Sequence, residues 1–162
     1  MVIQASAAVP SRRDQIRMSD EERRAFLEEQ MIVSCATTGP SGRPHLISLW
    51  CVPDGDELSG WTYAKSQKAR NLERDPHATL LVEDGVQYHE LRGVMLECDV
   101  ELERDPDRVA GYGLRLFRRY GRGELGPGVR EAVEKQAPKR VGLLFRPTRV
   151  VSWDHSKLGG TY

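Results

Sequence analysis

Apolar and polar residues alternate along several short stretches of the chain, a pattern that predicts β-strands. The longest stretch is residues 91–103, where every second residue from Val94 to Leu102 is apolar. Turn-forming residues such as Gly39-Pro40 separate these stretches. The pattern predicts six strands, at residues 31–38, 45–52, 57–64, 77–83, 91–103 and 140–145, with residues 148–153 continuing or pairing with the sixth. We expect the first three strands to form consecutive antiparallel hairpins.

Helices are predicted before and between these strands. The first begins at Ser19, a good N-cap residue, and Glu22 completes a capping box. Further helices are expected over residues 65–74, 105–120 and 129–137. This order predicts an α+β fold, a mainly antiparallel six-stranded barrel with flanking helices. Residues 1–17 lack periodicity and are expected to form a mobile tail ahead of one domain at residues 18–162.

Composition excludes several classes of protein. No apolar run approaches the roughly 20 residues of a membrane helix, and the first residues contain no apolar segment of a secretory signal. The 24 basic and 24 acidic residues balance, which argues against a broad nucleic-acid surface. Cys35, Cys51 and Cys98 are expected to be buried free thiols of a cytoplasmic protein. The scattered histidines indicate no metal site.

The segment TYAKSQKARNL, residues 62–72, carries the clearest chemical signal. A strand end meets a helix start there, and unpaired N–H groups at a helix start favour a phosphate. Ser66 can cap the helix or donate to a phosphate oxygen. Lys68 lies early in the helix, where the dipole disfavours a cation, and a bound anion would explain its position. A solvent-exposed basic helix face is the alternative interpretation.

Aromatic residues flank this segment. Trp50 ends the second predicted strand and Trp61 lies on the third. Aromatic and short hydrogen-bonding side chains beside an anion site suit a flat heteroaromatic ligand. The alternative is that both tryptophans belong to the core or to a dimer interface.

The chain resembles the split-barrel superfamily of flavin and deazaflavin oxidoreductases, which includes pyridoxamine 5'-phosphate oxidase. It is most similar to the actinobacterial deazaflavin-dependent reductase branch. The resemblance runs from about Ser19 to the C-terminus. It is carried by PHL at 44–46 with LW at 49–50, AKSQKARNLERDP at 64–76, LRGV at 91–94, KRVG at 139–142 and SWDHSKLG at 152–159. It implies an FMN-binding split barrel that forms a homodimer, with the cofactor at the interface.

The resemblance also implies which residues bind the cofactor. Strands two and three supply contacts to the ring and ribityl chain, the following helix supplies phosphate contacts, and the partner subunit offers a C-terminal aromatic residue. The matching positions are His45, Leu49, Trp50, Trp61, Thr62, Lys65, Ser66, Gln67, Lys68, Asn71 and Trp153.

The chain departs from the oxidase pattern at two of these positions. Trp50 stands where the oxidase has a basic residue, and His45 replaces an arginine. Both changes weaken the case for FMN with the oxidase's substrate and argue against oxidation of pyridoxamine phosphate. The apolar wall at Trp50 fits the deazaflavin branch, and so coenzyme F-420, better than FMN. We therefore expect an F-420-dependent oxidoreductase that transfers a hydride between the cofactor and a small organic acceptor. An FMN-binding oxidoreductase and a non-catalytic flavin or F-420 carrier are the alternatives. No catalytic residue is identified, although Tyr63, His45 and His155 are candidate proton donors.

A basic stripe gives a further alternative. Arg115, Arg118, Arg119 and Arg122 recur at helical spacing, which is compatible with nucleic-acid binding. The neutral net charge and the lack of a recognised reader motif argue against that function. A solvent-exposed helix face is the simpler interpretation.

Overall fold

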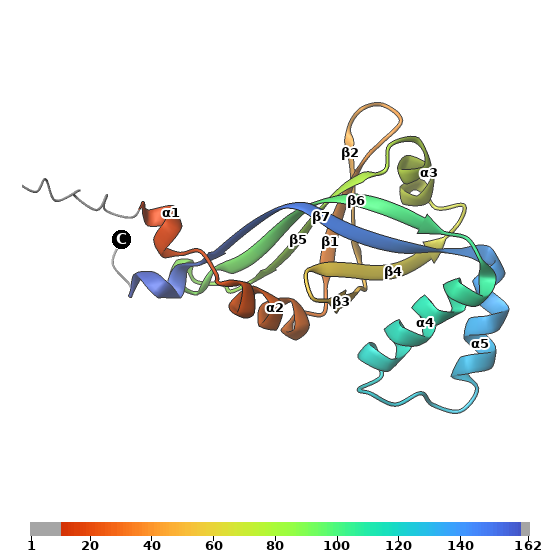
Figure 1. Ribbon diagram of the computed structural model, residues 1–162. Helices are drawn as coiled ribbons and strands as arrows, with labels where there is room; N and C mark the ends of the chain where they lie inside the picture. Colours follow the sequence, from red (N-terminus) through yellow and green to blue (C-terminus); the bar gives the residue numbers. More distant parts are fainter. Residues whose placement is uncertain (1–10, 160–162) are drawn as a thin grey trace, which may run out of the picture.

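The computed structural model describes residues 11–159 as one curved antiparallel sheet with flanking helices (Figure 1). The strands are β1 (Val33–Thr38), β2 (Pro44–Leu49), β3 (Val52–Asp54), β4 (Glu57–Tyr63), β5 (His77–Asp84), β6 (Arg92–Glu103) and β7 (Arg140–Asp154). The helices are α1 (Arg12–Gln15), α2 (Asp20–Glu29), α3 (Gln67–Arg74), α4 (Pro106–Tyr120) and α5 (Val129–Gln136), with single 3-10 turns at Tyr88–Glu90, Ala137–Lys139 and His155–Leu158. The predicted α+β barrel is confirmed, with seven strands in place of six.

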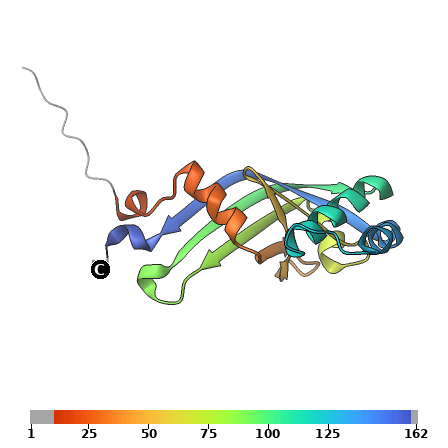
Figure 2. The ribbon, with the colours of Figure 1, turned by 90° about the horizontal axis from the view of Figure 1, so that it is seen from below.

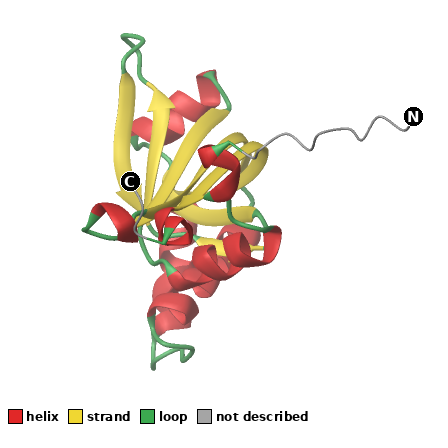
Figure 3. Ribbon diagram, turned by 90° about the vertical axis from the view of Figure 1, so that its left-hand side faces the viewer, coloured by secondary structure: helices red, strands yellow, loops and turns green. Residues whose placement is uncertain are grey.

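The extra strand arises because predicted strand 45–52 divides in two. β2 pairs with β1, placing Ile47 opposite Cys35, whereas β3 pairs with β4, placing Val52 opposite Ser59. The sheet order is β2-β1-β5-β6-β7-β4-β3, so Trp50 and Cys51 alone connect its two edges. The expected hairpin between the second and third strands therefore forms only through β3, and β2 does not pair with β4. This bend curls the sheet, as Figure 3 shows from the side.

The core fills the concave side of this sheet. Alternate residues of the long strands point inward, and Leu80, Leu96, Leu143 and Phe145 have no exposed surface. Helices α2 and α3 add apolar side chains at the rim, including Phe26. The capping box that starts α2 is present as predicted, since Ser19 and Glu22 each accept a backbone hydrogen bond from the other residue.

Cys35, Cys51 and Cys98 are buried and unpaired, as predicted. Burial raises the pKa of Cys35 to about 11 and that of Cys98 to about 12, and it also raises the pKa of Cys51. All three groups are therefore neutral thiols at physiological pH, which makes them poor nucleophiles.

The N-terminal segment differs from the expected tail. Residues Arg12–Gln15 form a short helix that Ser11 caps. The Asp154 amide donates to the Ile16 carbonyl at 2.7 Å, so this segment is attached to the end of β7. The rest of the predicted tail, residues 1–10, lies outside the described residues. No helix in residues 11–159 has the length and apolar character needed to cross a membrane.

Helices α4 and α5 pack together at one end of the sheet, opposite the end that carries α1 (Figure 2). Val109, Val133 and Ala137 form a second small core between them, and Trp61 of β4 packs against it. Gly113 lies where the Trp61 ring meets α4. A Cβ atom there would lie 2.6 Å from Trp61 Cζ3 and 2.9 Å from Val133 Cγ1.

We therefore expect Gly113→Ala to lower the free energy of unfolding by about 1–2 kcal/mol. Overpacking costs about 1–3 kcal/mol, and the gain of about 1 kcal/mol in helix propensity only partly offsets it. The matched control is Gly111→Ala in the same helix, where a Cβ meets nothing within 4 Å, so this change should stabilise the protein. Urea denaturation measures both values, and equal effects of the two changes would contradict the packing argument.

Candidate functional site

The site begins where β4 passes into α3. β4 ends at Tyr63 and α3 begins at Gln67. Ser66 is the N-cap, and its Oγ accepts the Ala69 amide at 3.3 Å. Helix geometry leaves the Gln67 and Lys68 amides without an intrahelical acceptor. The predicted strand-to-helix junction is therefore present, with unpaired donors at the helix start.

Lys68 folds back over this junction. Its Nζ donates to Thr62 Oγ1 at 2.7 Å, and Thr62 Oγ1 lies 3.3 Å from Ser66 Oγ. The lysine is half-buried, and burial lowers its pKa. Within residues 11–159, no carboxylate lies close enough to form an ion pair with it. A cation that has lost part of its hydration without gaining a counter-ion is costly, and a bound anion would relieve that cost.

Asn71 holds α3 in place. It has no exposed surface, and its Nδ2 donates to Thr37 Oγ1 on β1 at 3.0 Å. Its Oδ1 accepts from Gln67 Nε2 at 2.8 Å. Asn71 was predicted as a cofactor contact, but it can only act indirectly, by positioning the start of α3. Gln67 and Lys65 are exposed on the same turn.

The edge strand β2 carries two further predicted site residues, His45 and Leu49. His45 is opposite Thr37 in the register, so it shares the inward face with Leu49. The Nδ1 atom of His45 is buried and has no hydrogen-bond partner. Leu49 packs against the core. β2 is an edge strand that pairs only with β1, so no backbone hydrogen bonds join it to β4.

Trp50 stands at the bend between β2 and β3. Its ring stacks on Tyr120 with centroids 4.2 Å apart and planes 10° apart, and half of the residue remains exposed. The Tyr120 hydroxyl donates to the Met31 carbonyl at 2.6 Å and accepts the Cys51 amide at 3.1 Å. The indole is therefore held in a defined orientation while part of it is open to a ligand or partner.

Trp61 and Thr62 point to opposite sides of β4. Thr62 contacts Lys68 and Ser66, and we call these three residues the Lys68 cluster. Trp61 instead packs under α4. The Arg140 guanidinium lies 4.2 Å from the centre of the Trp61 ring and 4.1 Å from that of Tyr63. Burial is the main cause of the lowered pKa of Lys68, and the charge of Arg140 adds to it. Arg140 is not among the residues predicted for the site, because only the β4–β7 register places it opposite Tyr63.

Trp153 lies far from this cluster. It follows Arg140 by thirteen residues on β7, a separation of about 42–44 Å along an extended strand. Its ring packs against Gly93 of β6. His155 follows Trp153, and its ring meets that of Tyr88 edge to face, with the ring centroids 4.6 Å apart. The Nδ1 atom of His155 is buried and has no hydrogen-bond partner among residues 11–159. One protomer therefore cannot bring Trp153 and Lys68 into contact with the same small ligand.

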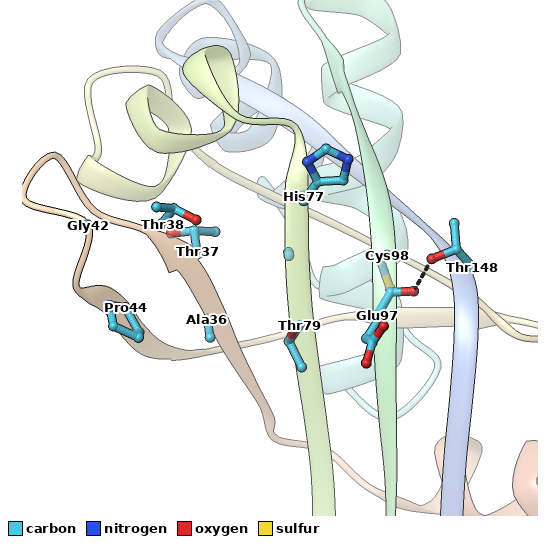
Figure 4. Close-up of a pocket in the computed structure, with 11 residues that line it drawn as sticks. Ala36, Thr37, Thr38, Gly42, Pro44, His77, Thr79, Glu97, Cys98 and Thr148 are labelled. Atoms are coloured by element: carbon cyan, nitrogen blue, oxygen red, sulfur yellow. Dashed lines mark hydrogen bonds between the residues drawn. The ribbon is translucent and has the colours of Figure 1, made fainter.

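A separate hollow of about 380 Å³ lies on the sheet beside the β1–β2 hairpin (Figure 4). Its polar lining comes mainly from four threonines together with His77 and Glu97. The Thr148 hydroxyl donates to the Glu97 carbonyl at 3.1 Å. None of the predicted site residues lines this hollow, although it includes Thr37, the partner of Asn71.

Comparisons with known structures give neighbours of several kinds. The conserved hypothetical protein Rv2991 from Mycobacterium tuberculosis is 39% identical, with 94% of this chain and 95% of that chain covered and a TM-score of 0.84. An F420 reductase is 26% identical, with coverage of 88% and 98% and a TM-score of 0.62. The heme storage protein HutZ from Vibrio cholerae, at 17% identity, coverage of 87% and 99% and a TM-score of 0.65, shares the fold. A search among curated proteins finds no match.

A family profile settles the classification. The profile described as pyridoxamine 5'-phosphate oxidase matches residues 19–154, which include every strand of the sheet and the β4–α3 junction. The superfamily resemblance inferred from the sequence is thus confirmed. This chain belongs to the pyridoxamine 5'-phosphate oxidase family.

Proposed function

We propose that this protein is an F-420-dependent oxidoreductase that acts as a homodimer and transfers a hydride between the cofactor and a small organic acceptor. The observation that carries the proposal is Lys68 at the start of α3, a half-buried cation without an acidic partner among the described residues. A phosphate at this point would meet the Lys68 ammonium, the Ser66 hydroxyl and two unpaired amides.

The residues divide into distinct roles. Ser66 and Lys68 would hold the cofactor phosphate, and Asn71 would keep the helix start in register with β1. His45 and Trp50 would border the ring on the β2 side, with Trp50 fixed by its stacking on Tyr120. When bound, the cofactor supplies the hydride chemistry, and the protein orients it and excludes water. His45, whose buried Nδ1 has no hydrogen-bond partner among residues 11–159, would be the proton donor or acceptor.

Two observations support a dimer. Large apolar side chains are exposed along β2 and beside it, with Leu46 67% and Ile32 55% exposed. An exposed apolar patch of this kind typically marks an interaction surface. In addition, Trp153 lies too far along β7 to reach the Lys68 cluster of its own chain. Trp153 from a second copy would complete the site at the interface.

The choice of F-420 over FMN has narrower support. The F420 reductase is 26% identical over nearly its whole length, and Trp50 presents an aromatic surface rather than a basic residue. FMN is the alternative, because the same phosphate cluster would serve either cofactor. A carrier that binds the cofactor without turnover would use the same site.

Titration of the purified protein with F-420 and with FMN tests the proposal. Cofactor absorbance and tryptophan quenching report binding, and the stronger binder identifies the cofactor. Steady-state reduction of enones, quinones and biliverdin-like tetrapyrroles then tests for an enzyme. Tight F-420 binding with turnover of any acceptor supports the proposal, binding without turnover favours a carrier, and no binding of either cofactor refutes the site.

A further inference from the structure

A second basic region lies away from the Lys68 cluster. The C-terminal half of α4 and the residues after it form a groove of about 420 Å³ against α2 and β3. We call it the arginine groove. It is lined by Glu28, Val52, Pro53, Arg115, Arg118, Arg119, Arg122 and Gly123. Four guanidinium groups and a single carboxylate therefore share one hollow.

Two of these arginines are already engaged. Arg115 Nη2 donates to Ser59 Oγ at 2.8 Å. Arg119 is 13% exposed, bonds to Glu28 Oε2 at 2.8 Å, and donates to carbonyls at the end of α2, including that of Gln30 at 3.0 Å. Its Nε atom is buried without an acceptor. The carboxylate of Glu28 is thus paired with Arg119, and the charges of the other three arginines are not balanced by it.

Arg118 and Arg122 have no such partners. Both are exposed, and neither side chain makes a hydrogen bond or an ion pair within the described part of the chain. Arg122 adopts φ of 59°, a left-handed conformation that favours glycine, and it is the one non-glycine residue with positive φ among residues 11–159. The Gly123 amide bonds to the Arg118 carbonyl at 2.7 Å across this turn. The helix end therefore carries an arginine where helices usually place glycine.

We propose that the arginine groove binds a compact ligand with at least two oxyanionic groups, phosphate or carboxylate. Guanidinium groups bind both kinds of group in a bidentate manner, and the hollow is within the size range of small-molecule sites. Arg119, which lines the groove, also has a buried Nε donor without an acceptor among residues 11–159. A long polyanion is disfavoured, because the carboxylate of Glu28, at the C-terminal end of α2, lines the groove.

Pyrophosphate titration tests this proposal. All proteins in the test carry Lys68→Ala, so that pyrophosphate cannot bind at the cofactor phosphate site proposed above. The test variant is Arg118→Gln with Arg122→Gln. The matched control is Arg104→Gln with Arg108→Gln, which removes the same charge from two exposed arginines outside the groove. Calorimetry should show pyrophosphate affinity falling at least tenfold in the test variant and by no more than twofold in the control. Equal losses in both variants, or no binding in the Lys68→Ala background, would overturn the proposal.

Three further ligands, inorganic phosphate, citrate and an oligothymidine, test which chemistry the groove recognises. Inorganic phosphate should bind at least tenfold more weakly than pyrophosphate, and equal affinities would overturn the requirement for two groups. Citrate distinguishes a carboxylate ligand from a phosphate ligand, and binding of either with the same arginine dependence supports the groove. A single-stranded oligothymidine is the third ligand tested. If it binds and pyrophosphate cannot displace it, the groove binds nucleic acid and the proposal of a compact ligand is overturned. Should the test variant not fold, Arg118→Lys with Arg122→Lys keeps the charge and should still weaken binding by losing the bidentate geometry.

Discussion

Lys68→Ala should weaken cofactor binding by on the order of 1.5–3 kcal/mol, roughly 10- to 150-fold, the scale of a charge-assisted hydrogen bond. The reason is that Lys68 is the half-buried cation at the junction, and its Nζ is held at 2.7 Å from Thr62 Oγ1 above the unpaired amides. Fluorescence titration with F-420 and FMN measures the effect. The matched control is Arg70→Ala, an exposed basic residue of the same helix outside the predicted site, which should change affinity much less.

The same variant separates binding from folding. The cofactor-free Lys68→Ala protein should be at least as stable as the parent, because the change removes a partly desolvated cation that has no counter-ion within residues 11–159. Thermal unfolding without cofactor checks this expectation. Weaker binding together with a stability loss large enough to unfold the protein would remove the support for the phosphate assignment, as would unchanged affinity for both cofactors.

The lowered pKa of Lys68 also fixes the sign of two pH dependences. Burial lowers the pKa of the folded-state lysine, so the folded protein loses this proton before the unfolded chain does. The contribution of Lys68 to folding stability therefore becomes more favourable as pH rises from the lowered pKa toward the ordinary value of about 10.4. Affinity for an anionic cofactor should fall over the same window, and Lys68→Ala should remove that decline.

Mixing two variants that each bind the cofactor weakly should restore tight cofactor binding if the site spans two subunits. Lys68→Ala and Trp153→Ala are each expected to bind F-420 weakly. In a mixed dimer, one site combines the intact Lys68 of one chain with the intact Trp153 of the other. Random reassociation yields mixed dimers in half of the population, so about a quarter of all sites should regain parental affinity. Stoichiometric titration after denaturation and refolding of the mixture measures the recovered fraction.

The control mixture combines Lys68→Ala with Thr62→Ala. Both residues belong to the same cluster in one chain, so no arrangement of the two variants reconstitutes an intact site. Recovery in this control, or none in the Lys68→Ala and Trp153→Ala mixture, would contradict a shared site. A monomer in analytical ultracentrifugation would contradict the dimer directly.

Local chemistry explains which predictions the structure confirms. The capping box of Ser19 and Glu22, the cap at Ser66 and the strands of alternating character all depend on residues a few positions apart. The segment of residues 62–72 likewise contains both the strand end and the helix start, so its unpaired amides follow from chain geometry. The sequence by itself therefore determined the α+β barrel, the buried thiols and the strand-to-helix junction with its unpaired amides.

Only the tertiary structure decided how distant segments meet. The bend at Trp50 and Cys51 splits one predicted strand between two sheet edges, because each half pairs with a different neighbour. Register across β4 and β7 places Arg140 against Trp61 and Tyr63. The length of β7 separates Trp153 from Lys68, and burial of Asn71 makes it a support for α3. Strand pairing over long sequence separations depends on packing of the whole core, and no local pattern encodes it.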